Sequence, residues 1–399
     1  MNKIELAPEW LDKLNPEQRE AVETTEGPLL VLSGAGTGKT RVLTSKIAYI
    51  LWKQLAFPWQ ILAVTFTNKA ANEMKNRVRD IIGGGADGLW IGTFHSVGLR
   101  ILKKYAELAG LKPGFLIFAE DDQRILIKKT MEEDFKLDTK KLPPSTLLDI
   151  VARLKDKGLY YDSGDIPLAE AGAAGGKILE IYRRYQERLK ELNAADFGDL
   201  LLYPLMIFEK NPAVLEEFQK KFKYILVDEY QDTNAVQYKL LKLLSALNRN
   251  IACVGDDDQS IYSWRGAEIE NILRFERDFT GARVIRLETN YRSTPHILSA
   301  ASHLISKNRD RLGKTLRPCG ALSSGEAAKV QVRGVWNGDE EARQITDEIE
   351  HYQRKGTPLS EMAVLVRAGY QTRLFEERFI RAGIPYRIVG GLRFYERQE

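Results

Sequence analysis

Five short apolar runs, each followed at once by polar residues, set the pattern of this chain. They cover residues 29–32, 61–64, 225–227, 251–254 and 284–287. Four of the runs are apolar throughout, and the fifth is interrupted only by Arg286; such runs are typical of strands buried on both faces of a parallel sheet. Helical patterns separate the runs. The chain is therefore expected to form an α/β fold whose polar strand ends gather along one edge, where such sheets bind ligands.

A different pattern interrupts these runs between residues 101 and 197, where apolar residues recur at helical spacing among many charges. The helical stretches cover residues 121–135, 144–157 and 176–192. We therefore expect an all-helical insertion at residues 101–197. It divides the first α/β domain into residues 1–100 and residues 198–288.

A second α/β pattern covers residues 289–399 and gives the chain its second expected domain. The expected strands of this domain are residues 330–335, 362–366 and 386–389. Three strands are few for a sheet of this class, so the second domain looks incomplete.

A glycine-rich loop follows the first apolar run. Its sequence is Ser33-Gly34-Ala35-Gly36-Thr37-Gly38-Lys39-Thr40. This approximates the pattern G-x-x-x-x-G-K-[ST], except that Ser33 stands at the position of the first glycine and Gly34 comes one residue after it. Glycines let backbone N–H groups point into one concavity, and the helix that follows adds its positive end. Lys39 would reach the β- and γ-phosphates of a nucleotide, and the Thr40 hydroxyl would hold Mg²⁺. The alternative is a strand-to-helix turn without a ligand.

Two carboxylates, Asp228 and Glu229, come directly after the third run. A carboxylate at a strand end beside a phosphate loop can hold Mg²⁺, and a neighbouring one can polarise the attacking water. We therefore assign Asp228 to the metal and Glu229 to general base catalysis. The alternative, a solvated acidic turn, is disfavoured by the phosphate loop.

Composition removes several other classes of protein. No apolar stretch approaches the ~20 residues that cross a membrane, and the acidic N-terminus is no signal peptide. The two cysteines, Cys253 and Cys319, and the four histidines show no metal-ligand spacing. These features predict a cytoplasmic protein without a membrane partner. The net charge of +4 is too small to indicate a nucleic-acid partner by itself.

Further motifs make the chain resemble a known family. Together with the phosphate loop and Asp228-Glu229-x-Gln231-Asp232, they resemble the UvrD/Rep/PcrA group of superfamily 1 DNA helicases. The resemblance runs from Leu14 to the last residue. Its other motifs are Thr65-Phe66-Thr67-Asn68-Lys69-Ala70-Ala71-x-Glu73-Met74, Gly92-Thr93-Phe94-His95-Ser96, Gly255-Asp256-x-Asp258-Gln259-Ser260-Ile261-Tyr262-x-Trp264-Arg265-Gly266-Ala267 and Asn290-Tyr291-Arg292-Ser293.

The resemblance implies RecA-like domains and an ATP site with Mg²⁺. Gln18 would read the adenine edge, although Asn15 and Gln18 also suit a helix capping box, and both interpretations stay open. Gln259 would sense the γ-phosphate and Arg292 would act as an arginine finger. The implied nucleotide-binding residues are Gln18, Gly34, Ala35, Gly36, Thr37, Gly38, Lys39, Thr40, Arg41 and Tyr291.

The resemblance also implies a track for single-stranded DNA, on which aromatic faces stack without reading sequence. A core role is the open alternative for Phe197, and a structural hydrogen bond is the alternative for His95. The implied DNA-binding residues are Phe66, Asn68, His95, Phe197, Tyr262, Trp264 and Arg265.

The sequence departs from the family pattern in three ways. Asp257 stands where a small residue is usual, with little expected effect, and Gly369 replaces an Asn, so no DNA contact is assigned there. Two later motifs, one with a second arginine finger, are missing because the chain ends first. It therefore looks like the N-terminal part of a helicase.

By resemblance, the expected function is an ATP-dependent helicase that moves 3′ to 5′ on single-stranded DNA and meets single-strand/duplex junctions. It would act in repair or replication restart, where repair-protein partners are possible. The alternative is a truncated module that binds ATP and single-stranded DNA with little turnover of its own. A GTP switch is disfavoured, because the sequence after Asn68-Lys69 lacks the Asp of an N-K-x-D motif.

Overall fold

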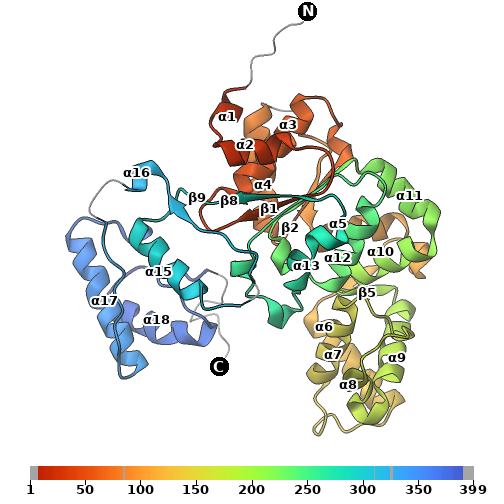
Figure 1. The fold of residues 1–399 in the computed structure, drawn as a ribbon. Coiled ribbons are helices and arrows are strands. Elements are labelled where there is room, and N and C mark those ends of the chain that lie inside the picture. The colour runs from red at the N-terminus through yellow and green to blue at the C-terminus, as the bar shows by residue number, and fades with distance from the viewer. Residues whose placement is uncertain (1–7, 84–85, 310, 324–326, 390–399) are drawn as a thin grey trace, which may run out of the picture. The chain divides into compact units, whose positions relative to one another are not determined.

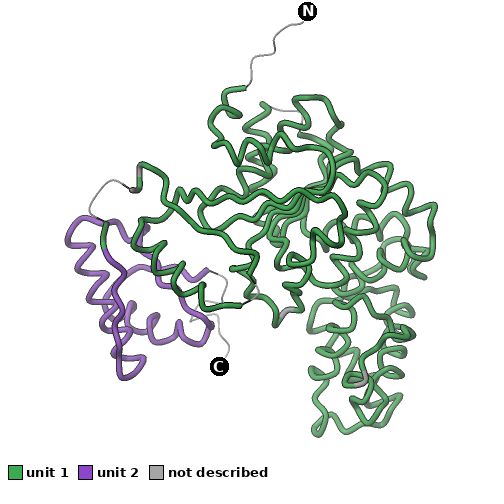
Figure 2. The backbone as a smooth tube through the Cα atoms, viewed as in Figure 1, with its two compact units in different colours: residues 1–328 green, residues 329–399 purple. Residues whose placement is uncertain are grey.

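The computed structural model describes residues 8–83, 86–309, 311–323 and 327–389. The chain forms two compact units, Met1–Ala328 and Lys329–Glu399, which Figure 2 colours separately. The second domain was expected to begin at residue 289, a position that lies inside the first compact unit. We describe each unit by itself.

A six-stranded parallel sheet with the order β3-β2-β6-β7-β1-β8 is the centre of the first unit (Figure 1). Five of its strands match the apolar runs of the sequence. The sixth, β3, was missed because it is short and ends in Gly92 and Thr93. The strands are β1 (Leu29–Ser33), β2 (Ile61–Thr65), β3 (Trp90–Thr93), β6 (Tyr224–Val227), β7 (Ile251–Gly255) and β8 (Arg283–Leu287).

Strands β1, β2, β6 and β7 are buried on both faces, as their apolar runs predict, whereas the edge strand β8 exposes Arg283 and Arg286. Because side chains alternate along a strand, Leu29 and Val31 pack into one core while Leu30 and Leu32 pack into the other. The first core is covered by α1 (Glu9–Asp12), α2 (Pro16–Glu23), α3 (Lys39–Trp52) and α4 (Asn68–Ile82). The second is covered by α5 (Phe94–Lys104), α10 (Asp199–Lys210), α11 (Pro212–Lys221), α12 (Ala235–Ser245), α13 (Glu270–Leu273) and α14 (Phe275–Asp278).

The insertion is mainly helical, and its helices lie together (Figure 1), with most of them adding buried residues to the second core. They are α6 (Glu120–Lys129), α7 (Pro144–Asp156), α8 (Leu168–Ala171) and α9 (Ile178–Glu191). It is not all-helical, however. Strands β4 (Leu116–Phe118) and β5 (Ala194–Asp196) pair in parallel at its base. Three residues a strand are too few to leave a pattern in the sequence, so this expectation was wrong in detail.

After β8 the chain leaves the six-stranded sheet, and a later segment returns beside it to form a separate two-stranded sheet. Strand β9 (Thr289–Asn290) leads to α15 (Pro295–Ile305), and the returning segment pairs with β9 through β10 (Arg317–Pro318) before α16 (Gly320–Ser323). Arg286 in β8 holds this segment as well, since its guanidinium donates to the carbonyl oxygen of Gly313 at 3.1 Å.

The second unit packs α17 (Gly338–Arg354) against α18 (Thr372–Arg381) around Ala342, Phe375, Phe379 and Ile384. The strands expected at residues 330–335, 362–366 and 386–389 are wrong for this structure. Among residues 329–389, none of these segments pairs into a ladder. Apolar β-prone residues make a strand only when a neighbour supplies hydrogen bonds, and pattern alone does not reveal whether one does.

Among the helices of the described residues, none combines the length and apolar character that a membrane-crossing helix requires.

Candidate functional site

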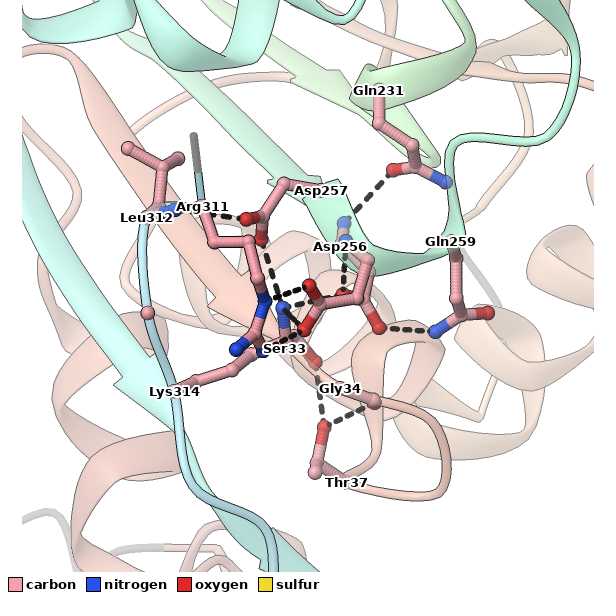
Figure 3. Close-up of polar contacts among 12 residues, drawn as sticks. Ser33, Gly34, Thr37, Gln231, Asp256, Asp257, Gln259, Arg311, Leu312 and Lys314 are labelled. Carbon is pink, nitrogen blue, oxygen red and sulfur yellow. Dashed lines mark hydrogen bonds and ion pairs between the residues drawn. The ribbon is translucent and has the colours of Figure 1, made fainter. Parts of the chain in front are cut away.

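The phosphate loop links the end of β1 at Ser33 to the start of α3 at Lys39. Gly36 and Gly38 have φ of 72° and 92°, which an L side chain rarely adopts. Space is short as well, since a Cβ on Gly36 would lie 2.6 Å from Nδ2 of Asn290. The Thr37 hydroxyl donates to the carbonyl oxygen of Gly34 at 2.9 Å and fixes the turn (Figure 3). The loop is thus a shaped turn that requires glycine.

Lys39 is the cation of this loop. Its buried ammonium lies 3.2 Å from Oε2 of Glu229 and has no hydrogen-bond partner among the described residues. A buried donor without such a bond is unusual, because desolvating it costs free energy. The ammonium therefore suits a phosphate group that would complete its hydrogen bonds. Thr40 is the next residue of α3.

Three carboxylates face Lys39 from the end of β6 and the turn after it. Burial, and then the charge of Glu229, raises the pKa of Asp228 to about 6 and that of Asp232 to about 7. Glu229 itself has a left-handed backbone with φ of 48°, and its amide donates to the Asp228 carboxylate at 3.1 Å. Crowded carboxylates beside a phosphate loop fit the oxygen ligands that Mg²⁺ prefers.

Gln231 connects these carboxylates to the next strand. Its amide nitrogen donates to Oε2 of Glu229 at 2.9 Å, and its oxygen accepts the backbone N–H of Asp256 at 2.9 Å. Asp256 follows β7 and accepts a hydrogen bond from the amide of Gln259 (Figure 3). The expected base, Glu229, and the expected γ-phosphate sensor, Gln259, therefore belong to one chain of polar contacts.

Both interpretations of Gln18 are compatible with its contacts. Its oxygen accepts the Asn15 backbone N–H at 3.2 Å, and Asn15 accepts the Gln18 N–H at 2.7 Å, so the capping box is confirmed. The amide nitrogen of Gln18 also donates to the carbonyl oxygen of Thr37 in the phosphate loop at 2.9 Å. The adenine role stays a prediction.

Tyr291 and Arg41 both contact residues just before the start of α2. The Asn15 amide donates to the Tyr291 hydroxyl at 2.9 Å, and the Tyr291 backbone N–H donates to Gly36 at 2.8 Å. Arg41 donates to the carbonyl oxygen of Lys13 at 2.9 Å. Tyr291 is 45% exposed, and its stacking on a base stays a prediction. Arg292 is exposed, and the Asn290 side chain accepts its backbone N–H at 2.9 Å.

The aromatic candidates fall into two groups. In the first, the rings of Phe66 and Tyr262 stack at 5.2 Å, and Tyr262 lies 6.3 Å from Trp264, which is 63% exposed. In the second, Phe197 lies 6.1 Å from the ring of His95, edge to face. Phe197 is 52% exposed, so the core alternative for this residue is wrong.

The remaining DNA candidates are less well defined. Burial lowers the pKa of His95, which favours a neutral ring. Asn68 opens α4 and is exposed, and Arg265 closes the short turn Ser263–Arg265. These roles stay predictions.

A charge cluster at Asp257 could not be recognised from the sequence. The structure buries this residue, and its carboxylate accepts from Lys314 at 2.8 Å and from the Leu312 backbone N–H at 2.9 Å. The small effect expected of this departure does not fit such contacts. Lys314 and Arg311 belong to no motif, so only the fold brings them here.

Comparison with known proteins agrees with this geometry. The model of the UvrD/REP helicase N-terminal domain matches residues 14–280, and that of the UvrD-like helicase C-terminal domain matches residues 285–399. A probable DNA helicase II homolog of Rickettsia felis is 50% identical over 399 residues, and the ATP-dependent DNA helicase PcrA of Staphylococcus aureus is 43% identical over 389.

Each alignment covers 98% of this chain, but 59% of the Rickettsia protein and 52% of the Staphylococcus protein. The chain thus spans between about half and three fifths of the relatives' length. The two family models divide close to the domain change expected at residue 289, and together they account for nearly all of the sequence. The chain belongs to the UvrD/REP helicase family.

Proposed function

We propose that the chain hydrolyses ATP with Mg²⁺ and uses the energy to move along single-stranded DNA as part of a helicase. The observation that carries the proposal is the buried Lys39 ammonium, which has no hydrogen-bond partner in the described part of the chain and lies 3.2 Å from Oε2 of Glu229 after β6. Named relatives that are DNA helicases support the same function.

Each residue of the site then has a role in phosphoryl transfer. Lys39 and the loop amides hold the β- and γ-phosphates, while Thr40 and Asp228 hold the metal. Mg²⁺, when bound, neutralises charge on the phosphate oxygens. Glu229 accepts a proton from the attacking water, for which its contact with Lys39 must open. Gln259 contacts the γ-phosphate, and Arg292 offsets the charge that develops on it.

The nucleic-acid side of the proposal depends on the exposed aromatic residues. Phe66, Tyr262 and Trp264 stack on unpaired bases, and Phe197 adds a second stacking face. Movement from 3′ to 5′, action at single-strand/duplex junctions, and work in repair or replication restart with repair-protein partners are further parts of the proposal. These parts rest on the resemblance to the helicase family alone.

A second candidate is a module that binds ATP and single-stranded DNA with little turnover. The ion pair between Lys39 and Glu229 favours it, because a base held by a cation and by Gln231 is unready to accept a proton. Binding without DNA-stimulated hydrolysis would identify this candidate.

The test is nucleotide binding and hydrolysis by the wild-type chain and by Lys39→Ala, with and without single-stranded DNA. We expect Lys39→Ala to weaken ATP binding by about 10- to 100-fold, since hydrogen bonds to charged groups contribute about 1.5–3 kcal/mol. The exposed Lys53 at the end of α3 provides the control Lys53→Ala. Normal binding and hydrolysis by Lys39→Ala would remove the proposed site.

A further inference from the structure

Three consecutive aspartates at the end of β7 surround one ammonium group. The Lys314 Nζ lies 2.5 Å from Asp256, 2.8 Å from Asp257 and 2.8 Å from Asp258. The side chain of Lys314 is only 3% exposed. Three carboxylates this close could hold a metal ion, but here the lysine ammonium occupies the space between them (Figure 3).

A second cation completes this cluster. Arg311 binds both oxygens of Asp258, each at 2.6 Å, in the paired geometry that gives the strongest such contacts. Burial alone would lower the pKa of Lys314, but attraction to Asp256 and hydrogen bonds to the three aspartates raise it instead. Lys314 therefore stays charged, and the segment from Arg311 to Lys314 is fixed to the turn after β7.

This turn is also part of the nucleotide site. Asp256 accepts from Lys314 through one oxygen and from the Gln259 amide through the other. The Asp256 backbone N–H donates to Gln231, which in turn donates to Glu229 beside Lys39. A continuous set of polar contacts thus joins Lys314 to the phosphate loop.

The same segment touches the phosphate loop directly. Leu316 lies over Gly34, so closely that a Cβ at this glycine would collide with the leucine side chain. Directly after Leu316, β10 pairs with β9, whose Asn290 donates to the carbonyl oxygen of Ala35 at 2.5 Å. The segment therefore contacts the nucleotide site at the turn after β7, at the loop and at β9.

We propose that Lys314 is a positioning residue for recognition of the γ-phosphate: by holding Asp256, Asp257 and Asp258 together, it places the Gln259 amide where a nucleoside triphosphate is distinguished from a diphosphate. This inference rests on the proposed function. It gives a role to a residue outside every motif of the sequence.

Removing the ammonium would leave three carboxylates of the turn facing one guanidinium. Their mutual repulsion would move Asp256, and with it the Gln259 amide that it holds. The loop residues that meet the α- and β-phosphates keep their own contacts, such as the Thr37 hydrogen bond within the loop. Loss of Lys314 should therefore weaken triphosphate binding more than diphosphate binding.

The experiment compares dissociation constants of ADP and of a non-hydrolysable ATP analogue, both with Mg²⁺, for wild type, Lys314→Met and the control Lys307→Met. Lys307 is an exposed lysine shortly before the same segment. For Lys314→Met we expect the analogue to bind about tenfold more weakly, the order of one hydrogen bond to a charged group. ADP affinity should change less than about twofold, and Lys307→Met should match wild type.

Two further variants separate positioning from general damage. Adding Asp257→Asn to Lys314→Met removes one repelling charge and keeps an acceptor for the Leu312 N–H, so it should restore part of the preference for the triphosphate. Asp257→Asn alone disturbs the cluster less and should shift the preference in the same direction as Lys314→Met, by less. This milder variant keeps the test decisive if Lys314→Met does not fold.

Equal weakening of both nucleotides, or no change in their ratio in Lys314→Met and Asp257→Asn, would overturn the positioning role. Failure of the proposed function looks different. In that case the wild-type chain itself would bind neither nucleotide.

Discussion

Glu229 shows at the scale of one residue how a backbone conformation positions a carboxylate. Its left-handed φ of 48° is costly for a side chain with a Cβ, yet it places the carboxylate between Lys39 and Gln231. The sequence identified both carboxylates after the strand, because motif spacing records them. It did not reveal the strain or the contact with Gln231, which depend on how β6 and β7 end side by side.

Glu229→Gln should therefore bind Mg-ATP nearly as wild type does but lose most of its hydrolysis. The amide keeps the size and hydrogen bonds of the side chain, while its ability to take a proton from water disappears. General base catalysis contributes about 10²- to 10⁴-fold, which sets the expected loss. Single-turnover hydrolysis with saturating nucleotide measures it. Hydrolysis at more than half the wild-type rate would assign the base to another residue.

Trp264 is the residue on which the DNA proposal depends most directly. Trp264→Ala should weaken single-stranded DNA binding by about 1–3 kcal/mol, equally on mixed and homopolymeric strands, because a stacked ring does not read sequence. ATP binding should stay nearly intact. Trp59 provides a matched control, since it is 51% exposed and stacks on Phe57 at 4.7 Å. Titration of labelled strands tests both variants, and equal affinity of Trp264→Ala and wild type would exclude stacking there.

At the scale of elements, the insertion is joined to the rest of the first unit by a buried charge network. The ammonium of Lys155 in α7 lies 2.6 Å from Asp196 in β5 and 2.7 Å from Asp199, the first residue of α10. Gln186 of α9 accepts from the same ammonium at 2.6 Å. Four elements thus meet at one side chain. Helical periodicity in the sequence predicted the helices. It did not predict this junction, because the charged residues that form it look like ordinary surface residues in the sequence.

Lys155→Met should destabilise the fold by about 3–5 kcal/mol at pH 8, because two buried carboxylates lose their cation. Burial, and then the nearby Asp196, already raises the pKa of Asp199 to about 6, above its ordinary 3.8. A raised carboxyl pKa means that stability decreases as pH increases through this window. The variant raises this pKa further, so its deficit should shrink between pH 8 and pH 5.

Urea unfolding at several pH values measures this effect. Lys157→Met is the control, since its contact with Glu170 is 41% exposed on the lysine side and its loss should be small at every pH. A deficit for Lys155→Met that does not change with pH would show that the carboxylates are not the cause.

At the scale of the whole molecule, local pattern predicted the sheet of the first unit better than the layout of the second. Runs such as residues 251–254 are apolar because both faces are covered, so sequence alone indicates them. Residues 330–335 are also β-prone, with three valines, yet Val332 is 95% exposed and its segment forms no ladder in the described residues. Residues 251–254 have neighbouring strands to pair with, and residues 330–335 have none among the residues that the structure describes. The sequence of one run does not indicate whether such a neighbour exists. The contacts of Lys314 could not be predicted for a related reason, because its aspartate partners are distant in the sequence.

Binding to nucleic acid should prefer single strands over blunt duplex and weaken as salt increases. The net charge is only +4, so few phosphates are expected to be neutralised. For single strands the slope of log affinity against log salt is about −0.7 for each phosphate contacted, so we expect a shallow slope. Titrations of both kinds of DNA between about 50 and 200 mM salt provide the measurement. A preference for blunt duplex would contradict the stacking track.

The strand order of the sheet has a consequence for synthesis of the chain. Strand β1 carries the phosphate loop, yet it pairs with β7 and β8 and with neither β2 nor β3, its nearest successors in sequence. A chain is synthesised from its N-terminus, so β1 cannot form hydrogen bonds to β7 until the ribosome has added residues 251–255. The nascent chain is thus expected to expose an apolar strand for most of the time that the first unit takes to appear, and the proposed nucleotide site should form only near the end.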